Sequence, residues 1–221
     1  MIKQGKLHPI EKTAIPFHTI HVDHVGPFVT SNKNNKFLLV IIDAFTKFCI
    51  LEPVRDQKSK YVIKALMSLT YLFGAPYRII SDRGTAFTSK TFETFCKTYG
   101  IKHVLNAVAT PRANGQCERY NKTIVNALAT SAVEKETDKW DSFVKQIQCS
   151  LNTSFSRAIN TTPMESLIGC KSKNVAEAWI VNELKVEIER VDLNSLRRDI
   201  ADHITKDQRK QKERYDRTRK E

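Results

Sequence analysis

Three acidic side chains stand where a protein of mixed helices and strands places its chemistry. Asp23 lies near the end of a β-rich stretch, Asp82 ends another such stretch, and Glu118 falls in the first turn of a long helical stretch. Sheets flanked by helices carry their sites at strand ends and in the adjoining loops. Two hard divalent cations need oxygen ligands that carboxylates can bridge, and such a two-metal site acts on phosphate esters. The three acids could supply one.

Each of the three acids also has a purely structural interpretation. Asp23 and Asp82 precede glycine-containing segments and could form turn caps. Glu118 suits a helix N-terminus, because the helix dipole favours negative charge there. Taken singly, each acid fits the structural interpretation better, and only their combination favours catalysis.

Other polar residues near the acids are expected to be structural. Asp43 closes a strand before a short hairpin, and turns of that kind accept aspartate readily. His18, His21 and His24 are spaced like a metal cluster, but side chains alternate along a strand, so His21 faces away from the other two. The pattern therefore predicts no zinc site in this stretch.

The elements that must position these residues follow from the pattern of apolar residues and turn signals. Three consecutive strands, antiparallel to one another, are predicted over 17–25, 36–43 and 47–54. The remaining predicted elements alternate: a helix over 58–73, a strand over 77–81, a helix over 89–99, a strand over 101–107, and helices over 116–136 and 140–151. This order predicts an α/β sheet with helices on its faces.

Composition excludes several classes of protein. The chain has 221 residues, 41% hydrophobic and 27% charged, which excludes a wholly disordered chain. Its longest apolar run, Phe37–Ile42, is far shorter than the roughly 20 residues of a membrane span. No secretory h-region follows Met1, so an intracellular location is expected, and the five cysteines match neither a zinc site nor a disulfide framework.

The charge balance points to a polyanionic partner. With 36 basic and 24 acidic residues the net charge is +12, and basic side chains that neutralise phosphates release counterions. Residues 196–221 carry ten Lys or Arg against six Asp or Glu, with only three aliphatic side chains, so they cannot form a core alone. This tail is interpreted either as a solvated helix or as an arm that contacts DNA.

Several stretches, in order, resemble the catalytic core of retroviral-type integrases, and in particular that of gypsy-class LTR retrotransposons. The family pattern separates the second acid from the glutamate by 35 residues, and 35 residues separate Asp82 from Glu118. The resemblance covers about residues 12–171. It is carried by His21–Phe28, Phe37–Phe48, Ser81–Ser89, Thr110–Asn121 and Thr162–Gly169.

The resemblance implies an RNase H-like fold and a five-stranded mixed sheet flanked by helices. It also implies that Asp23, Asp82 and Glu118 are catalytic and hold two Mg²⁺ or Mn²⁺ ions. The implied activity is DNA integration: water cuts the 3′ end of the element's DNA, and the freed 3′-hydroxyl attacks target DNA. By the same resemblance Asn114, Asn121 and Lys122 contact the DNA end, with a solvated helix face as the structural alternative.

The family pattern is matched only in part. Neither the family's N-terminal zinc module nor its C-terminal DNA-binding module is found, and Cys117 replaces a small aliphatic residue. The expected organisation is a linker over 1–15, an integrase core over 16–170 and a basic helical extension over 171–221. The expected partners are DNA and further copies of the chain, without a membrane, and the expected location is nuclear or in virus-like particles. The alternatives are a domesticated DNA-binding or chromatin protein and a nuclease of the same fold.

Overall fold

Five strands form one mixed sheet in the order β3-β2-β1-β4-β5. The computed structural model describes residues 13–106, 115–132, 137–170 and 191–217, without the side chains of 115–119, 131, 132, 137, 215 and 216. The strands are β1 (Thr19–Val25), β2 (Phe37–Asp43), β3 (Cys49–Val54), β4 (Arg78–Ser81) and β5 (Lys102–Leu105). The first three pair antiparallel, whereas β4 pairs parallel with both β1 and β5. The predicted mixed sheet is confirmed.

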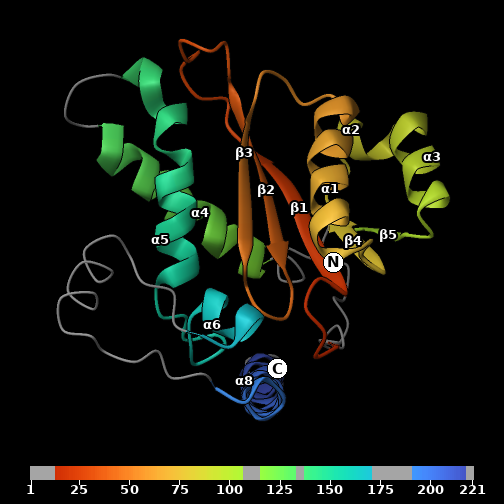
Figure 1. Ribbon diagram of the computed structural model, residues 1–221, viewed down its shortest axis with the longest axis vertical. Helices are drawn as coiled ribbons and strands as arrows, with labels where there is room; N and C mark the ends of the chain where they lie inside the picture. Colours follow the sequence, from red (N-terminus) through yellow and green to blue (C-terminus); the bar gives the residue numbers. More distant parts are fainter. Residues whose placement is uncertain (1–12, 107–114, 133–136, 171–190, 218–221) are drawn as a thin grey trace.

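Helices cover both faces of this sheet (Figure 1). On one side lie α1 (Ser59–Phe73), α2 (Thr85–Thr88) and α3 (Lys90–Thr98). On the other side lie α4 (Gly115–Ala132) and α5 (Val144–Thr153), preceded by the 3-10 helix η2 (Thr137–Ser142). Helix α2 was not predicted from the sequence, and the predicted helix over 140–151 spans parts of both η2 and α5.

Strand β2 is apolar from Phe37 to Ile42, and this stretch contributes to the cores on both faces of the sheet. Leu39 and Ile41 belong to the core beneath α1, whereas Leu38, Val40 and Ile42 belong to the core beneath α4 and α5. Side chains that alternate along a strand divide between two layers in this way. The cores on both faces fix the position of the adjoining β1, which carries Asp23.

Asp43 is fully buried at the hairpin that joins β2 to β3. Its carboxylate accepts hydrogen bonds from the Phe17 amide at 3.0 Å and from the amide and hydroxyl of Thr46 at 2.8 and 2.6 Å. Burial raises the pKa of Asp43, and the hydrogen bonds with Thr46 oppose that shift. These partners give Asp43 the structural role that the sequence suggested.

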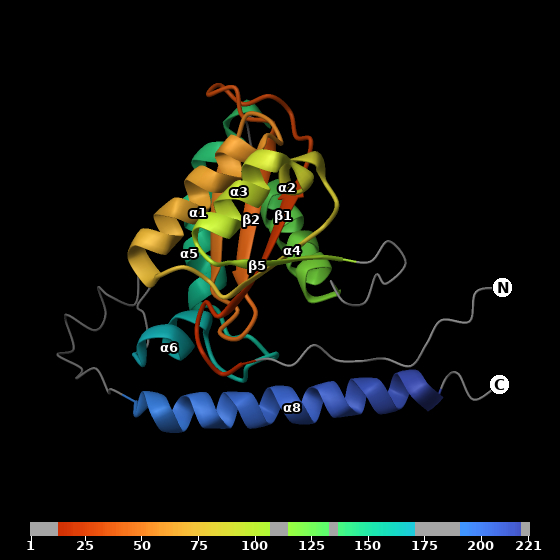
Figure 2. The same ribbon diagram turned by 90° about the vertical axis from the view of Figure 1, so that its right-hand side faces the viewer.

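Two further helices lie beside that hairpin: α6 (Pro163–Ile168) and α8 (Leu193–Arg217). Figure 1 shows α8 end-on and Figure 2 shows its length. Arg197 of α8 donates to the Leu167 carbonyl of α6 at 2.9 Å. Ile200 and Ile204 are buried with Phe45 and Ile159, so part of the predicted tail belongs to the domain core. Within the described ranges, no helix is long and apolar enough to cross a membrane.

Candidate active site

Asp23 and Asp82 come from neighbouring parallel strands. Val22 of β1 pairs with Ser81 of β4. Asp23 directly follows Val22, and Asp82 directly follows Ser81. Parallel strands present their carboxyl ends at the same edge of a sheet, so both acids lie at one edge. Asp82 is exposed and Asp23 is partly exposed, so both can meet a ligand from solvent.

Both oxygens of the Asp23 carboxylate are held by hydrogen bonds. Oδ1 accepts from the backbone N–H of His24 at 2.8 Å. Oδ2 accepts from Nδ2 of Asn121, on α4, at 2.8 Å. The Oδ1 of Asn121 is buried and has no hydrogen-bond partner. The bond from Asn121 joins β1 to the helix that carries Glu118, one turn before Asn121.

The other residues that the sequence analysis assigned to the site are placed only in part. Glu118 lies in α4, but its side chain is outside the described residues, as is the whole of Asn114. Lys122 is exposed, next to Asn121. Among the described side chains, no group of three His, Cys, Asp or Glu residues could hold a metal ion. Asn121, which the sequence assigned to the DNA end, also forms a hydrogen bond within the protein.

Asp82 is oriented by the turn that follows β4. Its Oδ1 accepts the backbone N–H of Gly84 at 2.9 Å. A Cβ on Gly84 would lie 3.0 Å from that same oxygen, so any other residue would require the carboxylate to shift by a few tenths of an ångström. Glycine at residue 84 therefore helps to keep the Asp82 carboxylate in this orientation through space rather than through its backbone angles.

His24 follows Asp23 and points to the opposite face of the sheet, toward Phe87 of α2. The two ring centroids are 5.4 Å apart, and Nε2 of His24 is buried without a hydrogen-bond partner. Burial lowers the pKa of His24, and the charges of Asp82 and Asp56 partly oppose that effect. His24 is therefore neutral at neutral pH, and it does not offset the negative charge of the two acids.

A hydrogen-bonded pair between β4 and β5 supports Asp82, and the sequence analysis missed it. The Ser81 hydroxyl donates to the Asp82 carbonyl at 2.9 Å, so it accepts from Nε2–H of His103 at 2.8 Å. The backbone N–H of Asn106 donates to the Ser81 carbonyl at 2.9 Å. Burial lowers the pKa of His103, which keeps its ring neutral. The sequence carried no distinct signal for this pair, because the same two short strands also contain Arg78 and Lys102.

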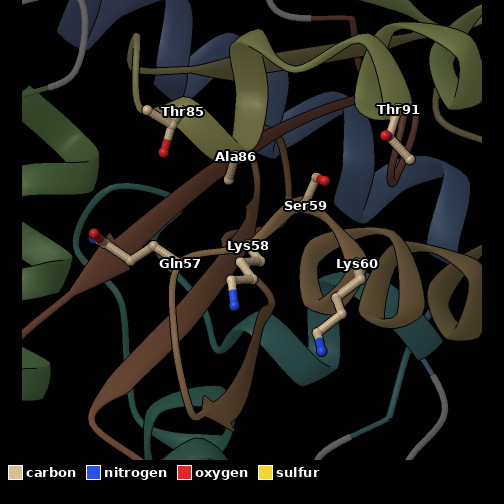
Figure 3. A pocket seen from close by; sticks show the side chains of 7 residues that line it. All are labelled: Gln57, Lys58, Ser59, Lys60, Thr85, Ala86 and Thr91. Carbon is tan, nitrogen blue, oxygen red and sulfur yellow. The ribbon is translucent and has the colours of Figure 1, made fainter.

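A basic hollow of 390 Å³ lies beside the turn that follows β4. Figure 3 shows the seven side chains around it: Gln57, Lys58, Ser59, Lys60, Thr85, Ala86 and Thr91. It is bounded by the start of α1, which has neither a side-chain cap nor an acidic residue in its first turn. Lys58 also forms an ion pair with Asp56 at 3.2 Å. Uncapped N–H groups, lysines and hydroxyls form a setting that suits an anion such as a phosphate group.

The chain is similar to known integrase cores. The family model described as "Integrase core domain" matches residues 14–111. The Pro-Pol polyprotein of simian foamy virus type 3 (strain LK3) is 33% identical over 162 residues, which cover 73% of this chain and 14% of the polyprotein. The "Gypsy retrotransposon integrase-like protein 1" of Bos taurus is 27% identical over 152 residues, which cover 69% of this chain and 30% of that protein. The chain thus spans less than a third of the length of these relatives.

Solved structures share the fold. The HTLV-2 integrase catalytic core domain in complex with magnesium, in its trimeric form, superposes with a TM-score of 0.56 at 25% sequence identity. The match covers 68% of this chain and 96% of that domain. The same sheet and flanking helices therefore occur in an integrase core, which confirms the predicted RNase H-like fold. Residues 14–111 thus match the integrase core domain family, and the chain shares its fold with a solved integrase core.

Proposed function

We propose that this chain is the catalytic core of a metal-dependent DNA integrase, which cuts a 3′ DNA end and joins it to a second DNA. The observation that carries the proposal is the bond from Asn121 to Asp23 at the edge that Asp82 shares. Asn121 lies one turn after Glu118 on α4, so this bond supports bringing the third acid to the first two. Retroviral and gypsy-type relatives support the same activity.

Asp23, Asp82 and Glu118 are the proposed holders of two Mg²⁺ or Mn²⁺ ions. The donor set fits such ions, because carboxylate oxygens are the ligands that hard divalent cations prefer. The neighbouring His24 is compatible with bound cations, because its neutral ring adds no positive charge that would repel them. When bound, the ions would activate a water or a 3′-hydroxyl as nucleophile and stabilise the leaving oxygen. A relative was solved with magnesium, which supports this choice of cofactor.

The residues around the acids would position the reacting groups. Asn121 holds the Asp23 carboxylate in one orientation, and the Gly84 amide does the same for Asp82. The basic hollow would bind a backbone phosphate of DNA, because its lysines supply positive charge beside the start of α2, which follows the Asp82 turn. Asn114, Asn121 and Lys122 are the proposed contacts of the DNA end. Holding the two reacting DNA strands in position would be the larger part of the protein's contribution to phosphoryl transfer.

The variant Glu118→Gln tests the proposal directly. It keeps the shape of the side chain and removes the negative charge of a metal ligand. With Mn²⁺ and a branched DNA substrate, we expect strand joining and cutting to fall roughly 10³-fold or more, the scale of losing a group that acts on the reacting atoms. DNA affinity and the far-UV circular dichroism spectrum should stay close to wild type. Near wild-type rates in Glu118→Gln would contradict the metal assignment.

The same assay separates the proposal from its alternatives. Strand joining by the wild-type chain supports an integrase, cutting without joining supports a nuclease of the same fold, and binding alone supports a domesticated DNA-binding protein. Oligomers are also proposed, because the HTLV-2 core domain was solved in trimeric and dimeric forms. Light scattering of the purified chain, with and without DNA, measures that property independently of catalysis.

A further inference from the structure

Helix α8 is anchored to the domain through its first half. Its aliphatic side chains, Leu196, Ile200 and Ile204, pack against Phe45 and Ile159. The second half, residues 205–217, runs past the edge of the domain on the side where α4 and β5 lie (Figure 2). A helical segment of this length is marginal by itself in water, so its folding depends on continuity with the anchored half.

The second half of α8 has no aliphatic surface to offer a partner. Residues 205–217 contain no Leu, Ile, Val, Met or Phe. Protein interfaces usually bury an apolar centre, and membrane-surface helices bury an apolar face. Neither can form here, so the projecting segment is suited to a partner that is recognised by charge.

Four basic side chains of this segment share one face of the helix. At about 100° per residue, Lys206, Lys210, Arg214 and Arg217 fall within an arc of about 80°. All four are exposed, and we call them the basic stripe. The stripe extends about 16 Å along the helix axis, a length over which B-DNA presents roughly ten phosphate charges.

The basic stripe lies on a flank of α8 that borders the domain. His203 falls within the same arc of the helix, one turn earlier, and its Nε2 forms a hydrogen bond with the Arg157 carbonyl at 3.0 Å. The stripe therefore continues the helix face of His203, which contacts the domain, into the part of α8 that projects beyond the domain (Figure 2). A rod-shaped ligand that follows the stripe would run toward that edge of the domain.

Like-charge pairs four residues apart occur along the basic stripe. Lys206 with Lys210, and Lys210 with Arg214, cost roughly 0.2–0.5 kcal/mol each in a free helix. Asp207 and Glu213 each lie three residues from Lys210 and flank the stripe, so they offset part of this cost without interrupting the stripe. An anionic ligand would relieve the repulsion that remains between the basic side chains.

From these observations we infer that the basic stripe binds the phosphate backbone of duplex DNA, without reading its sequence. The identity of this polyanion rests on the proposed function, whereas the position of the contact rests on α8 alone. The stripe would hold DNA next to the edge of the domain and thereby lengthen the surface along which the core grips its substrate.

The test compares two pairs of substitutions on the same helical segment. The stripe variant is Lys206→Gln with Lys210→Gln. The matched control is Arg209→Gln with Lys212→Gln, which removes the same charge from positions about 100° or more from the centre of the stripe around the helix. Fluorescence anisotropy with labelled duplexes of two unrelated sequences, in EDTA, gives log K against log salt for each full-length protein, and circular dichroism checks the helix content.

We expect the stripe variant to flatten the salt slope by about 1.8, which is 0.9 for each of the two phosphates that the variant no longer neutralises. Both DNA sequences should be affected alike, and the control should change the slope by less than half as much. Equal effects of the stripe variant and the control would overturn the inference, because the total charge of the segment, rather than its position on the helix, would then explain binding. So would an unchanged slope, a loss for one DNA sequence only, or a loss for duplex RNA without a loss for DNA.

This test fails or succeeds separately from the proposed function. Glu118→Gln should keep the wild-type salt slope while losing catalysis. A wild-type chain that neither cuts nor joins DNA would contradict the proposed function, yet a flattened slope in the stripe variant alone would still support the DNA contact of α8.

Discussion

Asn121 has a contact that the sequence did not predict. The sequence placed Asn121 on the same helix face as Glu118, and the family resemblance assigned it to the DNA end. In the folded chain its amide donates to Asp23 at 2.8 Å. A hydrogen bond to a carboxylate contributes about 1.5–3 kcal/mol, so Asn121 has a positioning role that is independent of any contact with DNA.

Substituting Asn121 should therefore affect catalysis more than binding. We expect Asn121→Ala to slow cutting roughly 10- to 100-fold, the rate equivalent of losing that hydrogen bond, while DNA affinity changes little. Asn126→Ala is the matched control, since it makes the same change at an exposed position of α4. Single-turnover cleavage at saturating DNA measures the rate. A loss of affinity with an unchanged rate would show that Asn121 acts as a DNA contact instead.

The acids and their supports differ in how far the sequence could predict them. Asp23 and Asp82 could be placed near strand ends because β-branched residues and turn signals mark the strands that contain or precede them, and the structure puts both acids at one edge of the sheet. The bond from Ser81 to His103 could not be predicted, since it depends on β4 and β5 being neighbours in register. Side-chain pairs between elements become visible only once the elements are packed.

At the scale of elements, the antiparallel strands and the mixed sheet were predictable, and the position of α8 was not. Leu196, Ile200 and Ile204 recur at intervals of four, which is the signal of an apolar helix face. Their partners, Phe45 and Ile159, are far away in the sequence, so the same pattern fitted a solvated tail. The solvated-helix interpretation therefore does not describe the first half of α8, whose aliphatic side chains pack into the core.

Ile200 should accordingly contribute to the stability of the whole domain. It is 2% exposed, and we expect Ile200→Ala to lower the free energy of unfolding by about 2–5 kcal/mol, the usual cost of emptying a buried aliphatic position. Asp199→Ala, at the exposed neighbouring position, should change it by less than about 0.5 kcal/mol. Urea denaturation measures both. Equal stability of the two variants would mean that α8 is not docked in solution.

At the scale of the whole molecule, the charges are divided between two kinds of surface. The sheet edge with Asp23 and Asp82 is acidic, whereas the hollow at the start of α1 and the second half of α8 are basic. The acidic edge suits cations, and the basic surfaces suit the phosphates of a long polyanion. A net charge of +12 also favours fast association with DNA that weakens as salt rises.

The two neutral histidines beside the acids give the whole domain a pH-dependent stability. Burial lowers the pKa of His24 and of His103 below the ordinary value of 6.5, so the unfolded chain binds more protons than the folded chain as pH falls through 6.5. Stability rises with pH wherever the unfolded state binds more protons. Their contribution is therefore fully present above pH 6.5 and is lost as pH falls toward the folded-state pKa values.

We expect the urea midpoint of the wild-type chain to fall between pH 7 and pH 5, and the fall to be smaller in His103→Gln. Glutamine keeps an N–H donor for the Ser81 hydroxyl and removes the group that titrates. Asp56 and Glu93 have lowered pKa values and ordinary values of 3.8 and 4.5, so they act at lower pH. Burial raises the pKa of Asp43, which opposes the fall in both proteins alike, so the difference between the two curves reports His103. A variant that follows the wild-type curve throughout would show that burial does not keep the His103 ring neutral.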